Sequence, residues 1–130
     1  MMLKDVRDYI DSLSIADYVY MGKLDNKKEC SIGVYHSKRN TAFQTAIGGP
    51  SLSSYGIKSV SFLIHWNKSP IDTENVANRL FDALKEVREA NINDATIKFI
   101  QLLSNEPIGV GTDDNGVYEM VIEAAIIYER

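Results

Sequence analysis

The sequence contains one cysteine, Cys30, among its 130 residues. A single cysteine cannot form an internal disulfide or a cysteine cluster for zinc, so neither is expected to stabilise the fold. No apolar run approaches the roughly 18 residues that a membrane span needs. Residues 1–13 carry charges where a secretory signal would be apolar. We therefore expect a protein that is made and used in a reducing cytoplasm.

An excess of positive charge is also absent. Lys and Arg total 14 against 18 Asp and Glu, which gives a formal net charge of −4. Nucleic-acid-binding domains usually carry a basic stripe, whereas here only the pairs Lys27-Lys28 and Lys38-Arg39 gather positive charge. We expect neither a nucleic acid nor a membrane as partner. The length and the 45% apolar content are typical of one globular domain, expected over residues 1–130.

Hydrophobic periodicity predicts two helices. Leu3, Val6 and Ile10 recur at helical spacing near the N-terminus. A second helix is predicted from Ser69-Pro70, where Ser69 or Asp72 caps it, to about Arg88, where residues 91–94 end it.

Alternating apolar residues predict strands in the rest of the chain. We expect a hairpin over residues 17–36, the strongest strand over 57–66, and further strands over 95–104 and 117–130. Residues 37–56 form a long connection that contains a possible short strand at 41–47. The predicted order α-β-β-β-α-β-β is α+β, a mostly antiparallel sheet with two helices packed on it.

The stretch IGVGTDDNG, residues 108–116, invites several functional interpretations. With Gly116 at position six of a calcium loop, positions one and twelve are Gly111 and Ile122, which cannot ligate. A phosphate-binding loop would need a lysine and a following helix, but a strand follows. The carboxylates of Asp113 and Asp114 are neighbours in a turn, where we expect solvated side chains with ordinary pKa values. A hairpin turn is the favoured interpretation.

Two histidines and the cysteine complete the candidates for chemistry. His36 ends a strand and His65 lies on the second face of another, and nothing in their spacing from Cys30 is typical of a metal site or a nucleophile–base pair. We expect edge-of-sheet histidines, no catalytic or metal site, and no cofactor. A small α+β enzyme or ligand-binding domain, with a pocket that includes His36, His65 and Cys30, stays open as an alternative.

The order of these patterns resembles the tail terminator proteins of long-tailed bacteriophages, in particular the group labelled phage minor capsid proteins. The resemblance covers nearly the whole chain. It rests on SIGVYHS before a long loop, VSFLIHW leading into the helix DTENVANRLFDAL, and NEPIGVGTDDNG before the last strand. The segment from Gly111 to Gly116 is similar to the family's Gly-x-Asp-acid-x-Gly hairpin. His65-Trp66 departs from the arginine- or glycine-ended strand that the family would show.

The resemblance implies a virion structural protein, not an enzyme. It would form a homohexameric ring at the head–tail junction that caps the tail tube, stops its polymerisation and meets the head connector, after assembly in the host cytoplasm. Another head-closure or neck component is the nearest alternative. We expect the 37–56 loop to dock the tube or a neighbouring subunit through Lys38, Arg39 and Phe43, and the hairpin at Asp113 and Asp114 to touch a neighbour.

Overall fold

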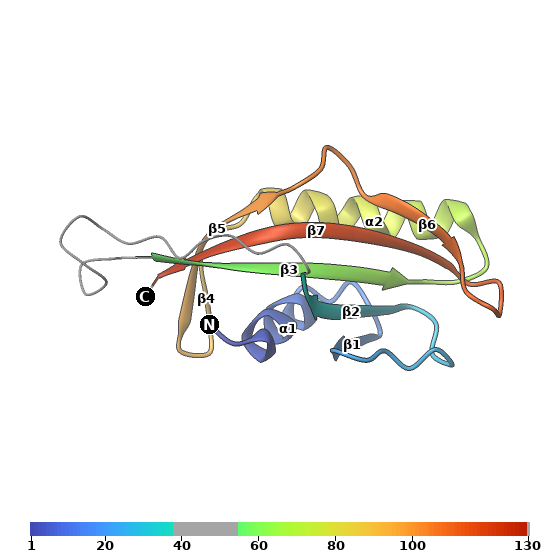
Figure 1. Ribbon diagram of the computed structural model, residues 1–130, viewed down its shortest axis with the longest axis horizontal. Helices are drawn as coiled ribbons and strands as arrows, with labels where there is room; N and C mark the ends of the chain where they lie inside the picture. Colours follow the sequence, from blue (N-terminus) through green and yellow to red (C-terminus); the bar gives the residue numbers. More distant parts are fainter. Residues whose placement is uncertain (38–54, 130) are drawn as a thin grey trace.

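The computed structural model describes residues 1–37 and 55–129, which form one curled seven-stranded sheet and two helices (Figure 1). The elements in chain order are α1 (Leu3–Ser12), β1 (Tyr18–Met21), β2 (Ser31–His36), β3 (Tyr55–His65), α2 (Pro70–Lys85), β4 (Arg88–Ile92), β5 (Ala95–Leu102), β6 (Ile108–Thr112) and β7 (Tyr118–Glu129).

The sheet is built around the long antiparallel pair β3 and β7. Its strand order is β1-β2-β3-β7-β5-β4, and β6 pairs with β7 outside this path. The β3–β7 register runs from Tyr55 opposite Glu129 to His65 opposite Glu119. On its other side β7 is shared, because β5 pairs with its C-terminal half and β6 with its N-terminal half. The α+β class is confirmed.

Helix α2 begins where its capping residues predict. The Ser69 hydroxyl accepts a hydrogen bond from the Asp72 amide at 3.3 Å, and Pro70 fills the first helical position, where no amide partner is lost. The apolar stripe of the helix is buried: Val76, Ala77, Leu80, Phe81 and Leu84. The helix ends at Lys85, before the predicted Arg88.

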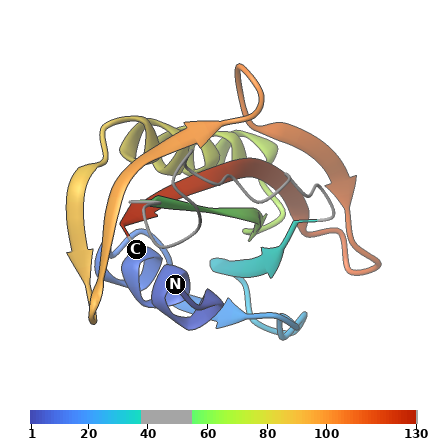
Figure 2. The ribbon, with the colours of Figure 1, turned by 60° about the vertical axis from the view of Figure 1, so that its left-hand side comes forward.

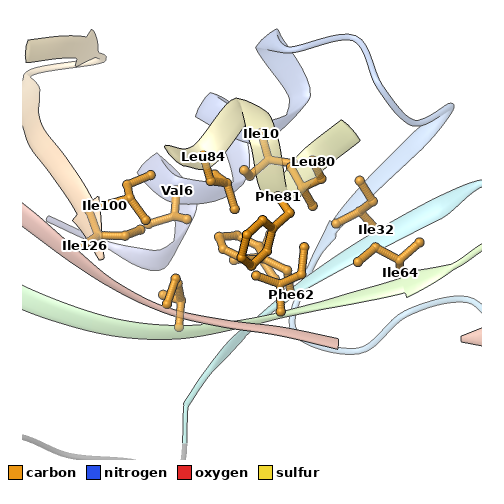
Figure 3. Close-up of a cluster of buried hydrophobic side chains, with 14 of the residues drawn as sticks. Val6, Ile10, Ile32, Phe62, Ile64, Leu80, Phe81, Leu84, Ile100 and Ile126 are labelled. Carbon is orange, nitrogen blue, oxygen red and sulfur yellow. The ribbon is translucent and has the colours of Figure 1, made fainter. Parts of the chain in front are cut away.

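Both helices and the sheet contribute to one buried cluster (Figure 3). Val6 and Ile10 come from α1, and Leu80, Phe81 and Leu84 from α2. From β3, Val60, Phe62 and Ile64 are fully buried on one face of the strand. At roughly 25 cal/mol per Å², this shared burial is the main favourable term of the fold.

Helix α1 connects the two ends of the curled sheet, as Figure 2 shows. The Arg7 Nε donates to the Val19 carbonyl of β1 at 3.0 Å. At the opposite end, the Asn93 side chain in the β4–β5 turn donates to Asp5 at 2.9 Å and to Asp8 at 3.1 Å. The sheet is therefore closed by a helix where a barrel would be closed by strand pairing.

The predicted hairpin over residues 17–36 is wrong, because β1 and β2 pair in parallel. Residues 22–30 lead the chain back along β1 before β2 begins, so Tyr18 pairs with Ser31. Gly22 and Cys30 at the ends of this connection have positive φ of 79° and 56°, which turns the chain at both points.

Two strands were not predicted as separate elements. Residues 88–92 form β4, and residues 93–94, expected to end a helix, form the β4–β5 turn with Asn93 at φ 52°. Residues 108–112, expected as part of a turn, form β6. The order α-β-β-β-α-β-β therefore lacks β4 and β6. The possible strand at 41–47 lies outside the described residues.

Candidate interaction surface

The hairpin between β6 and β7 is organised by Asp113. Its Oδ1 accepts the amides of Asn115 and Val117, each at 2.9 Å. The Asp113 amide also donates to the Val117 carbonyl at 3.0 Å. Gly116 supplies a φ of +81°, which L side chains rarely adopt. The predicted hairpin turn is confirmed over its second half, because only residues 113–117 turn.

The expectation of an ordinary pKa is wrong for Asp113. The pKa of its carboxyl lies below the usual value, mainly because the Val117 amide donates to the charged form, with further help from Asn115 and from His65. Asp114 is exposed, as expected. Sequence neighbours in one turn therefore differ in role, since Asp113 holds the turn together and Asp114 faces solvent.

His65 is fully buried, with no exposed surface, and it lies on β3 between β2 and β7. The expectation of an edge-of-sheet histidine is wrong for this residue. Its Nδ1 lies 2.9 Å from Oε2 of Glu119, and its Nε2 lies 3.8 Å from Oδ2 of Asp113. The second distance is too long for a hydrogen bond, so Nε2 is buried without a hydrogen-bond partner in the described structure.

His65, at the end of β3 where the sequence departs from the family pattern, therefore lies beside the hairpin that resembles that pattern. Glu119 is the residue that sequence reasoning missed. Its carboxylate faces away from the core, as the alternation in residues 117–130 predicts, but only the β3–β7 register shows that a histidine stands opposite.

His36, His65 and Cys30 do not converge on one pocket. His36 pairs with Val60 and His65 with Ser31, so the two histidines lie at opposite ends of the β2–β3 ladder. His36 is exposed at the end of β2. Burial is the main cause that raises the pKa of the Cys30 thiol, which is the opposite of what an activated nucleophile needs. Among the described residues, no group of three or more His, Cys, Asp or Glu side chains is arranged to hold a metal ion.

A second polar feature lies on the sheet face that carries His65. The Glu123 carboxylate accepts hydrogen bonds from Ser61 at 2.8 Å and from Ser37 at 3.1 Å. These residues line a depression of about 680 Å³ together with Tyr35, His36, Leu63 and Val121. Serine hydroxyls orient the carboxylate but supply neither a nucleophile–base pair nor a metal site, so the arrangement suits binding better than catalysis.

Apolar side chains are exposed at two strands on the rim of the sheet. All five residues of β6 are exposed, with Ile108 at 45% and Val110 at 51%. On β1, Tyr18 is 42% and Met21 53% exposed. The predicted interface residues Lys38, Arg39 and Phe43 lie outside the described residues.

No helix in the described part of the chain is long and apolar enough to cross a membrane. A family model described as "Bacteriophage tail terminator protein" matches residues 3–130. Among curated proteins, none matches the chain significantly.

Proposed function

The chain belongs to the bacteriophage tail terminator proteins, and from this premise we propose that it forms a homohexameric ring that caps the tail tube, stops its polymerisation and joins the tail to the head connector. Membership alone makes it a structural component of the phage tail and thus of the virion, in a family that is structural and not catalytic. The ring, its number of subunits and its two partners are the proposal.

The match to the family over residues 3–130 is the observation that carries this function. It includes both helices and all seven strands, so the likeness concerns the whole described fold and not one motif. The exposed apolar residues on β1 and β6 support assembly, because they are the kind of surface that a subunit contact would cover.

The two ends of the long β3–β7 pair suit two different partners. β3 begins at Tyr55, inside the predicted 37–56 connection, at one end of the long axis, and the β6–β7 turn lies at the other end (Figure 1). We propose that the 37–56 loop docks the tube or a neighbouring subunit. Its length, its basic pair Lys38-Arg39 and the aromatic Phe43 support this assignment.

The test is tube polymerisation from purified tube protein, with and without the terminator, followed by length measurement in the electron microscope. The wild-type chain should hold tubes at a fixed length and appear as a ring at one tip. A variant with residues 38–54 replaced by a short Gly-Ser link should fold normally, since loop closure depends weakly on length, yet leave tubes too long.

Two results would change the proposal. If the shortened variant caps tubes at normal length, the loop is not the docking element, and the β6–β7 hairpin becomes the candidate. If the wild-type chain leaves tube length unchanged but binds the connector, the protein acts as a head-closure or neck component. Asp113→Asn and Asp114→Asn variants then measure what the hairpin contributes.

A further inference from the structure

The turn between β6 and β7 contains the single Asn-Gly sequence of the chain, Asn115-Gly116. Both residues are exposed, and the Asn115 carboxamide makes no hydrogen bond in the described structure. Because glycine has no side chain, its backbone nitrogen is open to approach from the preceding carboxamide. The pair therefore has the groups that form a succinimide, a ring in which a backbone nitrogen attacks the side chain before it.

The closed turn holds Gly116 in the wrong geometry for this reaction. The Gly116 amide donates to the Asp113 carbonyl at 3.1 Å, and neither Asp114 nor Asn115 has a positive φ, which defines a type I turn. In such a turn the ψ of the third residue is about 0°, so the Gly116 nitrogen is eclipsed with the backbone nitrogen of Asn115. Ring closure needs it eclipsed with Cβ of Asn115 instead. The turn must therefore open before the ring can form.

Asp113 supplies the hydrogen bonds that keep the turn closed. Besides its carbonyl bond to Gly116, its Oδ1 accepts the amides of Asn115 and Val117, each at 2.9 Å. Its own amide donates to the Val117 carbonyl at 3.0 Å. Asp114, the next residue, is exposed and makes none of these contacts in the described structure. Opening of the turn therefore depends on Asp113 and not on Asp114.

We propose that Asn115 is a site of spontaneous deamidation, and that Asp113 controls its rate by keeping the turn closed. In the opened turn a base removes the Gly116 amide proton, and the nitrogen forms a bond to Cγ of Asn115. The bond from Cγ to the side-chain nitrogen breaks, and ammonia leaves with a proton from water. Water then opens the ring at either carbonyl, which gives aspartate or isoaspartate. The inference goes beyond ring assembly and does not depend on it.

The reaction changes the turn that it modifies. Either product adds a carboxylate beside those of Asp113 and Asp114. Isoaspartate also inserts Cβ into the main chain, which lengthens the backbone between the Asn115 and Val117 amides. These two amides share Oδ1 of Asp113, so the modified turn cannot keep both bonds in their present geometry. Deamidation therefore loosens the hairpin at this end of the molecule (Figure 1).

The test follows each asparagine by proteolysis and mass spectrometry after the full-length chain is incubated at mildly alkaline pH. Asn115 should react fastest in the urea-unfolded chain, and at least about tenfold more slowly in the native chain. Asp113→Ala removes the Oδ1 acceptor and should speed the native reaction by about fivefold or more. Asp114→Ala removes the same charge from the next residue and should change the rate by less than about twofold. Circular dichroism checks that each variant is folded.

Two further measurements separate opening of the turn from other effects. Asp113→Asn keeps an acceptor oxygen at the same place and should stay close to wild type. Amide hydrogen exchange at Gly116 reports opening independently of the chemistry. Asp113→Ala should therefore raise exchange and deamidation by the same factor.

Four results would overturn the proposal, and none of them bears on the ring. If Asn115 reacts no faster than Asn26 in the unfolded chain, it is not a preferred site. A native chain that reacts at Asn115 as fast as the unfolded chain would show that the turn gives no protection. Equal acceleration by Asp113→Ala and Asp114→Ala would assign the effect to charge. Faster deamidation of Asp113→Ala without faster exchange would show that Asp113 acts on the chemistry and not on opening.

Discussion

His65 on β3 and Glu119 on β7 stand directly opposite each other, with Nδ1 of the histidine 2.9 Å from Oε2 of the glutamate. The histidine has no exposed surface, and its second nitrogen faces Asp113 at 3.8 Å. Residues of β3, β7 and the β6–β7 turn therefore lie together at one end of the molecule, and His65 and Glu119 are joined by a hydrogen bond.

His65→Ala should lower the free energy of unfolding by about 2–4 kcal/mol, because it leaves a cavity and removes the partner of Glu119. His36→Ala is the matched control. His36 is exposed, so its loss should change stability by no more than about 0.5 kcal/mol. Urea unfolding followed by circular dichroism measures both, and equal effects would contradict the structural role of His65.

The protein should lose stability in acid. The pKa values of Asp5, Asp8 and Asp113 all lie below the ordinary 3.8, mainly through hydrogen bonds from Asn93, from Lys4 and from the Val117 amide respectively. A carboxyl whose pKa is lowered by folding stabilises the protein above its unfolded pKa. That stability is lost as the pH falls through the folded pKa. Urea unfolding between about pH 5 and about pH 2 should therefore show a steady decline.

Asp113→Asn should make this decline shallower, since the side chain no longer titrates. Asp114→Asn serves as its control, because Asp114 is exposed and accepts no hydrogen bond in the described structure. An acid profile that the two substitutions change equally would mean that the turn does not hold the Asp113 carboxylate in its charged form.

Asn93 joins the β4–β5 turn to α1 and has a φ of 52°. Asn93→Gly keeps access to this backbone conformation but loses both hydrogen bonds, at a cost of about 1 kcal/mol. Asn93→Ala loses the same bonds and adds about 1–2 kcal/mol of backbone strain. Thermal unfolding should rank the chains wild type, Asn93→Gly, Asn93→Ala. An alanine variant as stable as the glycine variant would remove the argument from backbone strain.

The Tyr35 ring lies across Gly33, so that a Cβ at residue 33 would be 2.6 Å from Cε2 of the ring. Gly33→Ala should displace the ring and cost about 1–3 kcal/mol. In a Tyr35→Ala background the space is free. The same substitution should then be neutral or stabilise by about 0.5–1 kcal/mol, because alanine loses less backbone freedom than glycine. A double-mutant cycle measured by urea unfolding checks this, and additive effects would contradict it.

Strong local patterns explain what the sequence could predict. Val60, Phe62 and Ile64 alternate on β3, and Ser69-Pro70 is a well-defined helix start, so both elements were found. β4 was missed because residues 88–92 contain few strand-forming side chains and follow an apolar helical stripe directly. The direction of β1 was missed because the path of residues 22–30, and not the composition of either strand, decides whether the pair is parallel.

The site was harder to predict for a related reason. His65 lies 54 residues before Glu119 and 48 before Asp113, and no local pattern joins them. The hairpin turn was recognised from Gly116 and the adjacent acids, which act within a few residues. The burial of His65 depends on the register of β3 with β7, which only the assembled sheet defines.

The long β3–β7 pair also has a mechanical consequence. β3 starts at Tyr55 at one end of the molecule, and β7 starts at Tyr118 at the other, with 11 residues of β3 paired between them. A pull applied outward at these two starting points loads the hydrogen bonds of the ladder in shear, so they resist together and do not open one after another. A subunit bound by partners at both ends would therefore transmit tension along its length with little extension.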